Sequence, residues 1–329
     1  MDLEGKKLLI TGASGFIGSH LTEELVNLGY DVRVFVRYTS DGNLGELSHL
    51  STDLLKKIEI VRGDLKNYDS VLRAVKDVDV IFHLGALISI PYSYLDPRDF
   101  VETNITGTLN ILNAAKNFNT KKIIITSTSE TYGTAIYTPM DENHPLQAQS
   151  PYSASKISAD KLAESFFKSF DLPVAIIRPF NTYGPRQSMR AVLPAIIYQA
   201  LTKDKLKLGS LTPQRDLTFV RDTVLAFIKI AESEKSVGEI INIGNGKTIS
   251  IQELVEKVGI MLDKKLIIEE IEEKIRPEKS EVDILLCNNE KARNMIGWKP
   301  SVSLNEGITE VISYVRENLN RYDSERDNL

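Results

Sequence analysis

The sequence predicts an α/β fold, with a doubly wound parallel sheet in its first half and a smaller C-terminal lobe. Short apolar segments rich in β-branched residues alternate with helical patterns as far as residue 178. A glycine-rich turn directly follows the first apolar segment. The length of 329 residues suits one large domain and one smaller one. Strands and helices that alternate in this way form parallel strands joined by right-handed crossovers.

The apolar segments follow one another through the first domain, which we expect over residues 1–178. The expected strands are residues 8–10, 32–36, 58–61, 80–83, 122–126 and 173–178. The expected helices are residues 20–28, 71–75, 100–118 and 153–170. After residue 178 the chain becomes turn-rich. We expect a second lobe mainly over 179–318, a return of 219–243 to the first domain, and a polar tail that frays over 319–329.

Composition argues against several classes of function. The formal net charge of −5 disfavours a protein that binds nucleic acid by charge. A single cysteine, Cys287, allows no intramolecular disulfide and fits a reducing compartment. That cysteine and the four histidines show no metal-ligand spacing, so we expect no metal. No apolar run approaches the ~20 residues of a membrane span, and the N-terminus lacks a signal-peptide pattern, so we expect a cytoplasmic protein without a membrane partner.

The turn at residues 11–18, Thr-Gly-Ala-Ser-Gly-Phe-Ile-Gly, is typical of a dinucleotide-binding site. Its glycines are spaced G-x-x-G-x-x-G, a variant of the commoner G-x-G-x-x-G. Glycines let the backbone approach a pyrophosphate, which the amides of the following helix then bind. An ordinary strand–helix turn is the alternative. The pattern favours a Rossmann-type domain whose cofactor contacts include Gly12, Ser14, Gly15, Phe16, Ile17 and Gly18.

The end of the second strand distinguishes NAD from NADP. An acidic residue there binds the ribose hydroxyls of NAD, whereas a basic residue favours the 2′-phosphate of NADP. The sequence has no carboxylate at this point, and Arg37 and Ser40 could hold a phosphate. We therefore favour NADP, with NAD as the alternative cofactor and a plain surface cation as the alternative for Arg37. Asp64 and Leu65 are candidates to bracket the adenine, although Asp64 could equally cap a helix.

Tyr152 and Lys156 form a Y-x-x-x-K pair in a segment with helical periodicity. Residues i and i+4 share one face of a helix, which brings the ammonium near the phenol. A free tyrosine has a pKa near ~10, so a neighbouring cation is needed before the phenolate can act as a base. We expect the Lys156 ammonium or a nicotinamide ring to lower the pKa of Tyr152. A surface Tyr–Lys pair is the alternative.

Five motifs occur in order: TGASGFIG at 11–18, HLGA at 83–86, STSETYG at 127–133, PYSASK at 151–156 and RPFNTYGPR at 178–186. Together they resemble the extended short-chain dehydrogenase/reductase superfamily, in its sugar-nucleotide epimerase/dehydratase group. The resemblance covers essentially the whole chain and implies a nucleotide-sugar substrate. It implies that Leu84, Gly85 and Ala86 line the cofactor and that Thr128 lies beside Tyr152. The two longest expected helices resemble the superfamily's intersubunit bundle, which implies a homodimer.

Glu130 distinguishes the subgroups of this superfamily. Plain 4-epimerases resemble one another in carrying small or neutral residues there, whereas nucleotide-sugar 4,6-dehydratases carry Thr-Asp-Glu or Thr-Ser-Glu. Here the three residues are Thr128, Ser129 and Glu130. The resemblance implies that Glu130 removes the C5 proton once C4 is a ketone. A serine hydroxyl is a poor proton donor, so we expect the protonated Glu130 to assist departure of the C6 hydroxyl. A strand-end surface carboxylate is the alternative for Glu130.

Other functions stay open beside a dehydratase. UDP-glucuronate decarboxylases resemble this stretch too, since they carry Thr-Ser-Glu, oxidise C4 and then lose carbon dioxide. A 4-epimerase on the same scaffold and a nucleotide-sensing regulator without turnover are further alternatives. Residues 83–94 and 209–223 favour a dehydratase because they are similar to the 4,6-dehydratases of the legionaminic acid pathway. Those enzymes act on an N-acetylglucosamine nucleotide, with GDP the implied carrier and UDP the alternative.

A sugar nucleotide carries a diphosphate, which cations and amide donors bind. The resemblance implies substrate contacts at Ser89, Asn181, Arg186, Arg215 and Arg276. A surface ion pair is the alternative for each arginine. We expect Trp298 to pack in a core rather than to stack on a nucleotide base.

Overall fold

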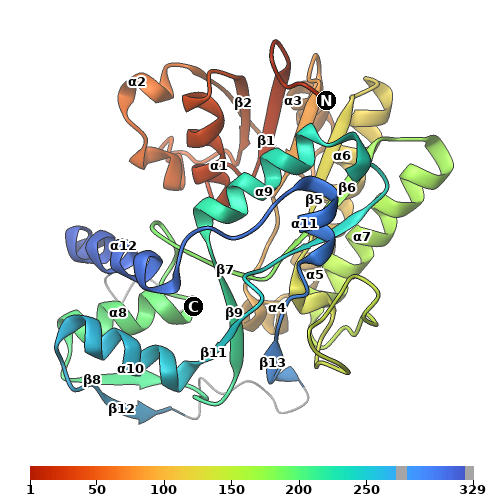
Figure 1. Ribbon diagram of the computed structural model, residues 1–329. Helices are drawn as coiled ribbons and strands as arrows, with labels where there is room; N and C mark the ends of the chain where they lie inside the picture. The colour runs from red at the N-terminus through yellow and green to blue at the C-terminus, as the bar shows by residue number, and fades with distance from the viewer. Residues whose placement is uncertain (272–279, 323–329) are drawn as a thin grey trace.

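A computed structural model describes residues 1–271 and 280–322. Its centre is a seven-stranded parallel sheet in the order β10-β6-β5-β4-β1-β2-β3. The strands are β1 (Lys7–Thr11), β2 (Asp31–Val36), β3 (Ile58–Arg62), β4 (Val80–His83), β5 (Lys122–Thr126), β6 (Val174–Pro179) and β10 (Ile240–Ile243). Helices cover both faces of the sheet (Figure 1). The expected α/β class with a doubly wound parallel sheet is therefore confirmed.

The strands are continuous apolar runs because both faces of the sheet are buried. Leu8 and Ile10 of β1 pack into the core on one face, while Leu9 packs into the core on the other. The first face is covered by α1 (Phe16–Asn27) and α9 (Val220–Glu232). The second face is covered by α3 (Tyr68–Val75), α6 (Gly107–Asn117) and α7 (Pro151–Phe170). Strand β10 extends the sheet beside β6, at its edge.

The segment 100–118, expected as one helix, is divided in the structure. After α4 (Ile90–Leu95) and α5 (Pro97–Phe100), the residues Val101–Thr106 form a π-helix that continues into α6. The Asn104 side chain donates to the carbonyl of Leu87 at 2.9 Å and accepts the amide of Leu87 at 2.8 Å. A π-helical turn adds a residue to the helix and is frequent at functional sites. Here it places Asn104 against the loop that follows β4.

The second lobe consists of small sheets and helices. Strand β9 (Gln214–Phe219) pairs with β11 (Thr248–Ser250), β13 (Ile284–Leu285) and β7 (Asn181–Tyr183). Strand β8 (Lys205–Leu208) pairs with β12 (Ile267–Glu270). The helices are α8 (Val192–Thr202), α10 (Ile251–Leu262), α11 (Glu290–Ile296) and α12 (Leu304–Glu317). The Trp298 ring is buried and donates Nε1–H to the carbonyl of Asp222 at 2.8 Å, the packing role expected for it.

Further short helices occur in the described chain, among them η4 (Glu234–Ser236) after α9. The residues between β2 and β3 form the 3-10 helix η1 (Gly45–His49) and α2 (Thr52–Leu55). The last described turn is the 3-10 helix η7 (Leu319–Tyr322), in which Tyr322 is 2% exposed. This part of the polar tail is thus packed rather than frayed, and residues 323–329 lie outside the described residues. Within the described chain, no helix is both long and apolar enough to span a bilayer.

Candidate active site

The glycine turn joins β1 to α1 with a backbone geometry that requires glycine. Gly12 has a φ of 71°, in the left-handed region. A Cβ on Gly12 would lie 2.7 Å from the amide nitrogen of Gly85, and a Cβ on Gly18 would lie 2.2 Å from the carbonyl oxygen of Gly12. Helix α1 begins at Phe16, and no side-chain hydrogen bond caps it in the described structure. Its first amides are therefore available to an anion at the positive end of the helix dipole, as a pyrophosphate requires.

A buried chain of hydrogen bonds fixes the floor of this turn. The Thr11 hydroxyl accepts the amide of Gly85 at 3.0 Å and lies 2.7 Å from Nδ1 of His83. On the other side of the ring, Nε2 of His83 lies 3.1 Å from the hydroxyl of Thr108. Burial lowers the pKa of His83 to about 3, so the ring is neutral. His83 therefore holds β1, β4 and α6 together below the glycine turn, a role that the sequence pattern did not indicate.

The loops after β2 and β3 border a hollow of about 470 Å³, where the adenosine end of a dinucleotide is expected. Arg37 and Asp64 line this hollow, and Arg37 and Ser40 are exposed. The alternative of Asp64 as a helix cap is not found. Asn67 caps α3 instead, by accepting the amide of Ser70 at 2.9 Å.

The loops after β3 and β4 meet beneath the glycine turn. A Cβ on Gly85 would lie 2.7 Å from Cδ1 of Leu65, so the Leu65 side chain closes against this glycine. The carbonyl of Leu65 accepts the side-chain amide of Asn110 at 2.8 Å. Leu84 and Ala86 are half-buried on either side of Gly85. The structure thus brings these expected cofactor contacts together.

Tyr152 and Lys156 lie one turn apart at the start of α7. A capping box formed by Ser150 and Ser153 begins this helix. Tyr152 is 7% exposed and Lys156 is 6% exposed, so the alternative of a surface pair does not hold. The Lys156 ammonium donates to the carbonyl of Thr126 at 2.5 Å. An ammonium carries three donors, which leaves two for a ligand within the described structure.

Burial raises the pKa of Tyr152 above its ordinary value. A hydrogen bond from Thr128 opposes this rise, whereas the charges of Glu130 and Asp160 add to it. The expectation that Lys156 lowers this pKa is therefore wrong for these side chains, because the cost of burying a phenolate dominates. A lowered pKa needs a further positive charge, such as the oxidised nicotinamide ring that was the second candidate.

Glu130 lies near Tyr152 on a short 3-10 helix, η3 (Ser129–Thr131). The Thr128 hydroxyl caps this helix by accepting the amide of Glu130 at 3.2 Å. Ser129 is 2% exposed, whereas Glu130 is half-buried. The Glu130 charge contributes to the raised pKa of Tyr152, so the two side chains share one electrostatic environment. Glu130 is therefore not a fully exposed strand-end carboxylate.

A buried ion pair fixes this arrangement from behind. Arg178 is 1% exposed and donates to Oδ2 of Asp160 at 2.8 and 3.2 Å. The Ser127 hydroxyl donates to the same oxygen at 2.6 Å. Asp160 lies one turn beyond Lys156, so the pair ties α7 to the ends of β5 and β6. The sequence pattern did not indicate this pair, although Asp160 continues the i, i+4 face of Tyr152 and Lys156.

The residues expected to contact the substrate lie on several elements. Ser89 caps α4 by accepting the amide of Tyr92 at 3.4 Å. Asn181 begins β7, and its Oδ1 is buried with no hydrogen-bond partner among the described residues, as suits a ligand contact. Arg215 on β9 pairs with Glu281 at 3.2 Å. The expected contact at Arg276 lies outside the described residues.

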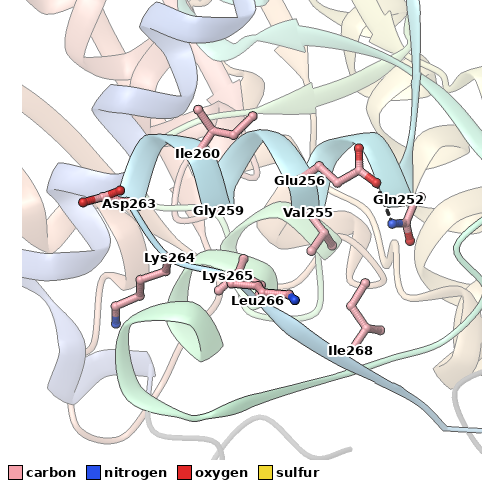
Figure 2. Close-up of a pocket in the computed structure, with 10 residues that line it drawn as sticks. All are labelled: Gln252, Val255, Glu256, Gly259, Ile260, Asp263, Lys264, Lys265, Leu266 and Ile268. Carbon is pink, nitrogen blue, oxygen red and sulfur yellow. Dashed lines mark hydrogen bonds between the residues drawn. The ribbon is translucent and has the colours of Figure 1, made fainter.

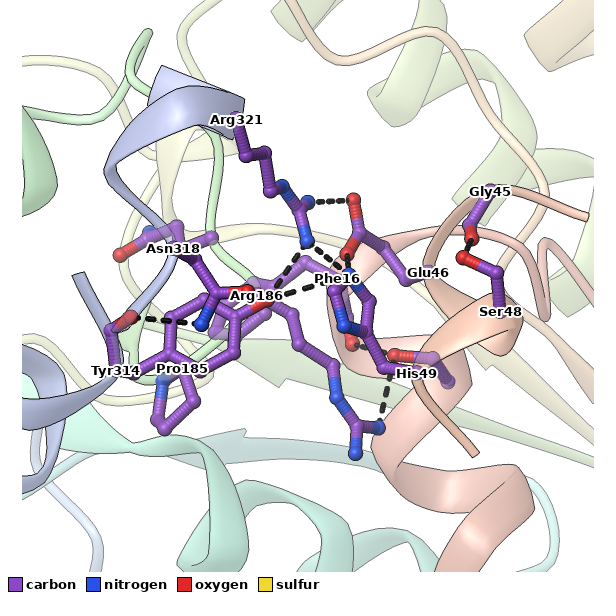
Figure 3. Close-up of polar contacts among 12 residues, drawn as sticks. Phe16, Gly45, Glu46, Ser48, His49, Pro185, Arg186, Tyr314, Asn318 and Arg321 are labelled. Carbon is purple, nitrogen blue, oxygen red and sulfur yellow. Dashed lines mark hydrogen bonds and ion pairs between the residues drawn. The ribbon is translucent and has the colours of Figure 1, made fainter. Parts of the chain in front are cut away.

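Arg186 has a different environment from the other expected substrate contacts. It is 9% exposed and donates to Glu23 of α1 at 2.6 Å and to Ser19 of α1 at 3.5 Å. Figure 3 shows its side chain among residues of η1 and α12. Arg186 thus joins the loop after β7 to α1, and its contact with a substrate stays a prediction.

Another hollow, of about 550 Å³, lies in the second lobe between α10 and β12 (Figure 2). Ile260, which is 81% exposed, and Ile268 form part of its apolar lining, and Asp263 and Lys264 lie at the end of α10. It contains none of the residues indicated by the sequence. Among residues 1–271 and 280–322, no group of three His, Cys, Asp or Glu side chains is placed to hold a metal ion.

Comparison with known proteins identifies the family. The family model described as GDP-mannose 4,6 dehydratase matches residues 9–311. The chain is 32% identical over 316 residues to the UDP-glucose 4-epimerase of Mycolicibacterium smegmatis, covering 94% of this chain and 98% of that protein. It is 35% identical over 324 residues to the UDP-N-acetyl-alpha-D-glucosaminuronate decarboxylase of Bacillus cytotoxicus, covering 95% and 98% respectively.

Solved structures agree with these sequence relatives. DesIV, the dTDP-glucose 4,6-dehydratase from Streptomyces venezuelae with NAD and TYD bound, has a TM-score of 0.88 at 27% identity. The similarity covers 97% of this chain and 99% of that chain. Proteins similar to this one thus include a dehydratase, an epimerase and a decarboxylase of nucleotide sugars. The chain belongs to the extended short-chain dehydrogenase/reductase family of nucleotide-sugar dehydratases, epimerases and decarboxylases that the GDP-mannose 4,6 dehydratase model describes.

Proposed function

We propose that this protein is an NAD-dependent nucleotide-sugar 4,6-dehydratase. The observation that carries the proposal is the position of Glu130, which is linked to Tyr152 through the Thr128 hydroxyl. A 4-epimerase needs one acid–base group at C4. A dehydratase needs a second acid–base group for the C5 proton and the C6 hydroxyl, and the Glu130 carboxylate supplies one near Tyr152.

Each side chain has a distinct part in the proposed reaction. When bound, NAD supplies the acceptor for the C4 hydride and the donor of the hydride that C6 receives. Tyr152 accepts the proton of the C4 hydroxyl, and Lys156 supports the phenolate and binds the cofactor. Glu130 then removes the C5 proton and transfers it to the C6 hydroxyl, which leaves as water. The buried Ser129 lies next to Glu130 in the chain. C6 then receives the hydride, a proton from solvent replaces the one lost from C5, and the product is a 4-keto-6-deoxy sugar.

The glycine turn fits a nicotinamide dinucleotide. A Cβ on Gly12 or Gly18 would fill the space that a close backbone approach needs, and the first amides of α1 are uncapped. We propose NAD rather than the NADP favoured by Arg37 and Ser40. Both of these residues are exposed. The similar dehydratase DesIV binds NAD. We therefore propose that Arg37, which directly follows β2, is a surface cation.

The proposed substrate is an N-acetylglucosamine nucleotide, with GDP or UDP as the carrier. Its support is the resemblance of residues 83–94 and 209–223 to the dehydratases of the legionaminic acid pathway. We propose that the lobe formed mainly by 179–318 covers this substrate and that Asn181 and Arg215 hold its diphosphate. Asn181 offers a buried, unpaired Oδ1 within the described structure, and Arg215 is 8% exposed beside Glu281.

A decarboxylase is the second candidate. It is favoured by the 35% identity to the Bacillus cytotoxicus decarboxylase and by the Thr-Ser-Glu sequence that such enzymes share. The product mass separates the candidates after incubation with GDP- and UDP-N-acetylglucosamine and with the corresponding uronate. Loss of water from the hexosamine supports the dehydratase. Loss of carbon dioxide from the uronate, without dehydration of the hexosamine, would overturn it, and an unchanged mass with an altered C4 configuration would indicate an epimerase.

We also propose a homodimer formed by α7 and the segment 100–118, in which the π-helix Val101–Thr106 continues into α6. Leu95 and Val101 are 77% and 49% exposed on segments that pack against α7, and burial of such side chains favours association. Light scattering of the eluting protein should give twice the mass of 36.8 kDa. A Leu95→Glu change should shift this mass toward the monomer, and a monomeric unaltered protein would contradict the proposal.

A further inference from the structure

Two neighbouring residues of η7 contact two loops, one near the expected NAD site and one near the expected sugar-nucleotide site. The Arg321 guanidinium forms an ion pair with Glu46 of η1 and contacts Nε2 of His49 (Figure 3). It also donates to the Tyr314 hydroxyl at 2.7 Å. The adjacent Tyr322 donates its hydroxyl to the carbonyl of Gln187 at 3.1 Å. Arg321 thus contacts the loop after β2, and Tyr322 contacts the loop after β7.

Helix η1, which Arg321 contacts through Glu46 and His49, packs directly against the glycine turn. The amide of Glu46 donates to the carbonyl of Ser14 at 2.9 Å. Gly45 has a φ of 58°, and a Cβ there would lie 2.5 Å from the same carbonyl oxygen. The backbone of η1 is therefore packed against the turn whose amides we propose to hold a pyrophosphate. If the backbone of Glu46 moves, the hydrogen bond that holds the Ser14 carbonyl must change as well.

The other side of these contacts involves residues 184–191, the loop after β7, which we call the substrate loop because it carries Arg186, one of the expected substrate contacts. The Gln187 side chain donates to the carbonyl of Thr182 at 2.9 Å. This hydrogen bond links Gln187 to β7, whose first residue is Asn181. Tyr322 is 2% exposed, so its hydrogen bond to Gln187 lies in a packed environment. The Tyr322 ring also packs against Tyr198 of α8. The loop after β7 is therefore fixed by the same turn that fixes η1.

The contacts of Arg321 exceed those of an ordinary surface ion pair. Its side chain is 27% exposed and that of Glu46 is 19% exposed. The guanidinium also lies over the rings of Tyr314 and Tyr322, at 6.0 and 5.8 Å from their centroids. Isolated exposed pairs contribute little, but a half-buried network with aromatic contacts holds one geometry.

We propose that residues 314–322, the C-terminal strap, position the glycine turn and the substrate loop relative to each other. Arg321 acts through Glu46 on the glycine turn, and Tyr322 acts through Gln187 on the loop after β7. Both are positioning residues, since they touch other side chains and backbone rather than reacting atoms. The inference rests on the proposed function in one respect, that these two loops bind NAD and the sugar nucleotide.

The test measures NAD affinity of the full-length protein by titration, together with its melting temperature. Arg321→Ala and Glu46→Ala should each weaken NAD binding about five-fold, and the double variant should be no weaker than either, because both remove one network. Arg321→Lys keeps the charge and should recover part of the affinity. Arg316→Ala, at an exposed position on the neighbouring α12, is the matched control and should bind NAD as the unaltered protein does.

Tyr322→Phe separates the two functions of the strap. It should raise the KM for the sugar nucleotide about three-fold while NAD affinity and kcat stay unchanged, since it removes one hydrogen bond to the substrate loop. Unchanged NAD affinity in Arg321→Ala, with or without a lower melting temperature, would overturn the positioning role proposed for the strap. Failure of the unaltered protein to bind NAD would instead overturn the proposed function, and the strap with it.

Discussion

The Thr128 hydroxyl is shared between the two proposed proton-transfer groups. It accepts the backbone amide of Glu130 at 3.2 Å and is hydrogen-bonded to the phenol of Tyr152. A single hydroxyl therefore sets the position of the carboxylate and opposes the rise in the pKa of the tyrosine. In the proposed dehydratase the same residue links the oxidation at C4 to the elimination that follows.

Replacing Thr128 with valine should reduce activity without unfolding the protein. A hydrogen bond to a charged group contributes about 1.5–3 kcal/mol, so the loss of stabilisation of the phenolate should lower kcat about ten- to a hundredfold. Thr128→Ser retains the hydroxyl and should recover most of the activity. Steady-state kinetics with circular dichroism as the folding check measures both. Equal kcat values for the two variants would show that the hydroxyl is not needed.

The affinity for NAD should depend on the ionisation of Tyr152. Burial raises the pKa of this phenol in the protein alone, and a bound nicotinamide cation should lower it again. By linkage, oxidised NAD then binds more tightly as the pH rises from the lower pKa of the complex towards the raised pKa of the free protein. Titrations of NAD across this range should show the trend in the unaltered protein and lose it in Tyr152→Phe. The same trend in both would assign it to another group.

Replacing Glu130 with glutamine should stop the reaction after C4 oxidation. Glutamine keeps the shape but accepts no proton, so the formation of dehydrated product should fall at least about a hundredfold. Substrate should still reduce bound NAD, which is measured by the absorbance of the reduced nicotinamide. Solvent deuterium should no longer enter C5 of the sugar.

A matched glutamine change tests the specificity of this effect. Glu164 lies on the same helix as Tyr152, and its carboxylate pairs with Lys161 at the surface at 2.9 Å. Glu164→Gln should leave the product, the deuterium uptake and kcat unchanged. Full dehydratase activity in Glu130→Gln would remove the carboxylate from the mechanism.

Local patterns in the sequence predicted most of the first domain. The apolar segments, the glycine turn and the helix that carries Tyr152 all lie where the alternation places them, because each depends on neighbours within a few residues. The division of residues 100–118 could not be read in this way. It accompanies hydrogen bonds between Asn104 and Leu87, which lie 17 residues apart in the chain.

The electrostatics of the site were less predictable than its residues. The i, i+4 spacing placed Lys156 near Tyr152, but the pKa of Tyr152 depends mainly on burial, which only the packed structure gives. Arg186 was indicated by its motif, yet its guanidinium pairs with Glu23, which precedes it by 163 residues. Such pairings depend on how distant elements meet, and no local pattern encodes them.

The glycine turn predicts a graded response to added methyl groups. A Cβ on Gly18 would lie 2.2 Å from the carbonyl oxygen of Gly12, which forces the backbone to move, whereas one on Gly15 would lie 3.3 Å from it. Because displacement of a binding backbone by about 1 Å can cost about a hundredfold, Gly18→Ala should weaken NAD binding by this order. Gly15→Ala should have a much smaller effect. Titration of both variants with NAD checks the order, and similar affinities would show that this contact does not position the cofactor.

The buried pair of Asp160 and Arg178 should govern stability. Both side chains are almost fully buried, and removing one charge leaves the other without compensation. Asp160→Asn should therefore lower the free energy of unfolding by about 3–5 kcal/mol. Asp53→Asn is the matched change at an exposed pair with Lys56 and should cost less than about 1 kcal/mol.

Urea denaturation followed by circular dichroism measures both losses in the Asp160→Asn and Asp53→Asn proteins. Similar values would mean that the Asp160–Arg178 pair contributes no more than a surface contact. A large loss in Asp160→Asn alone fits its connections, because Ser127 donates to the same carboxylate oxygen and directly precedes Thr128. The pair would then stabilise the fold through the same contacts that hold Thr128 and Glu130 against the start of α7.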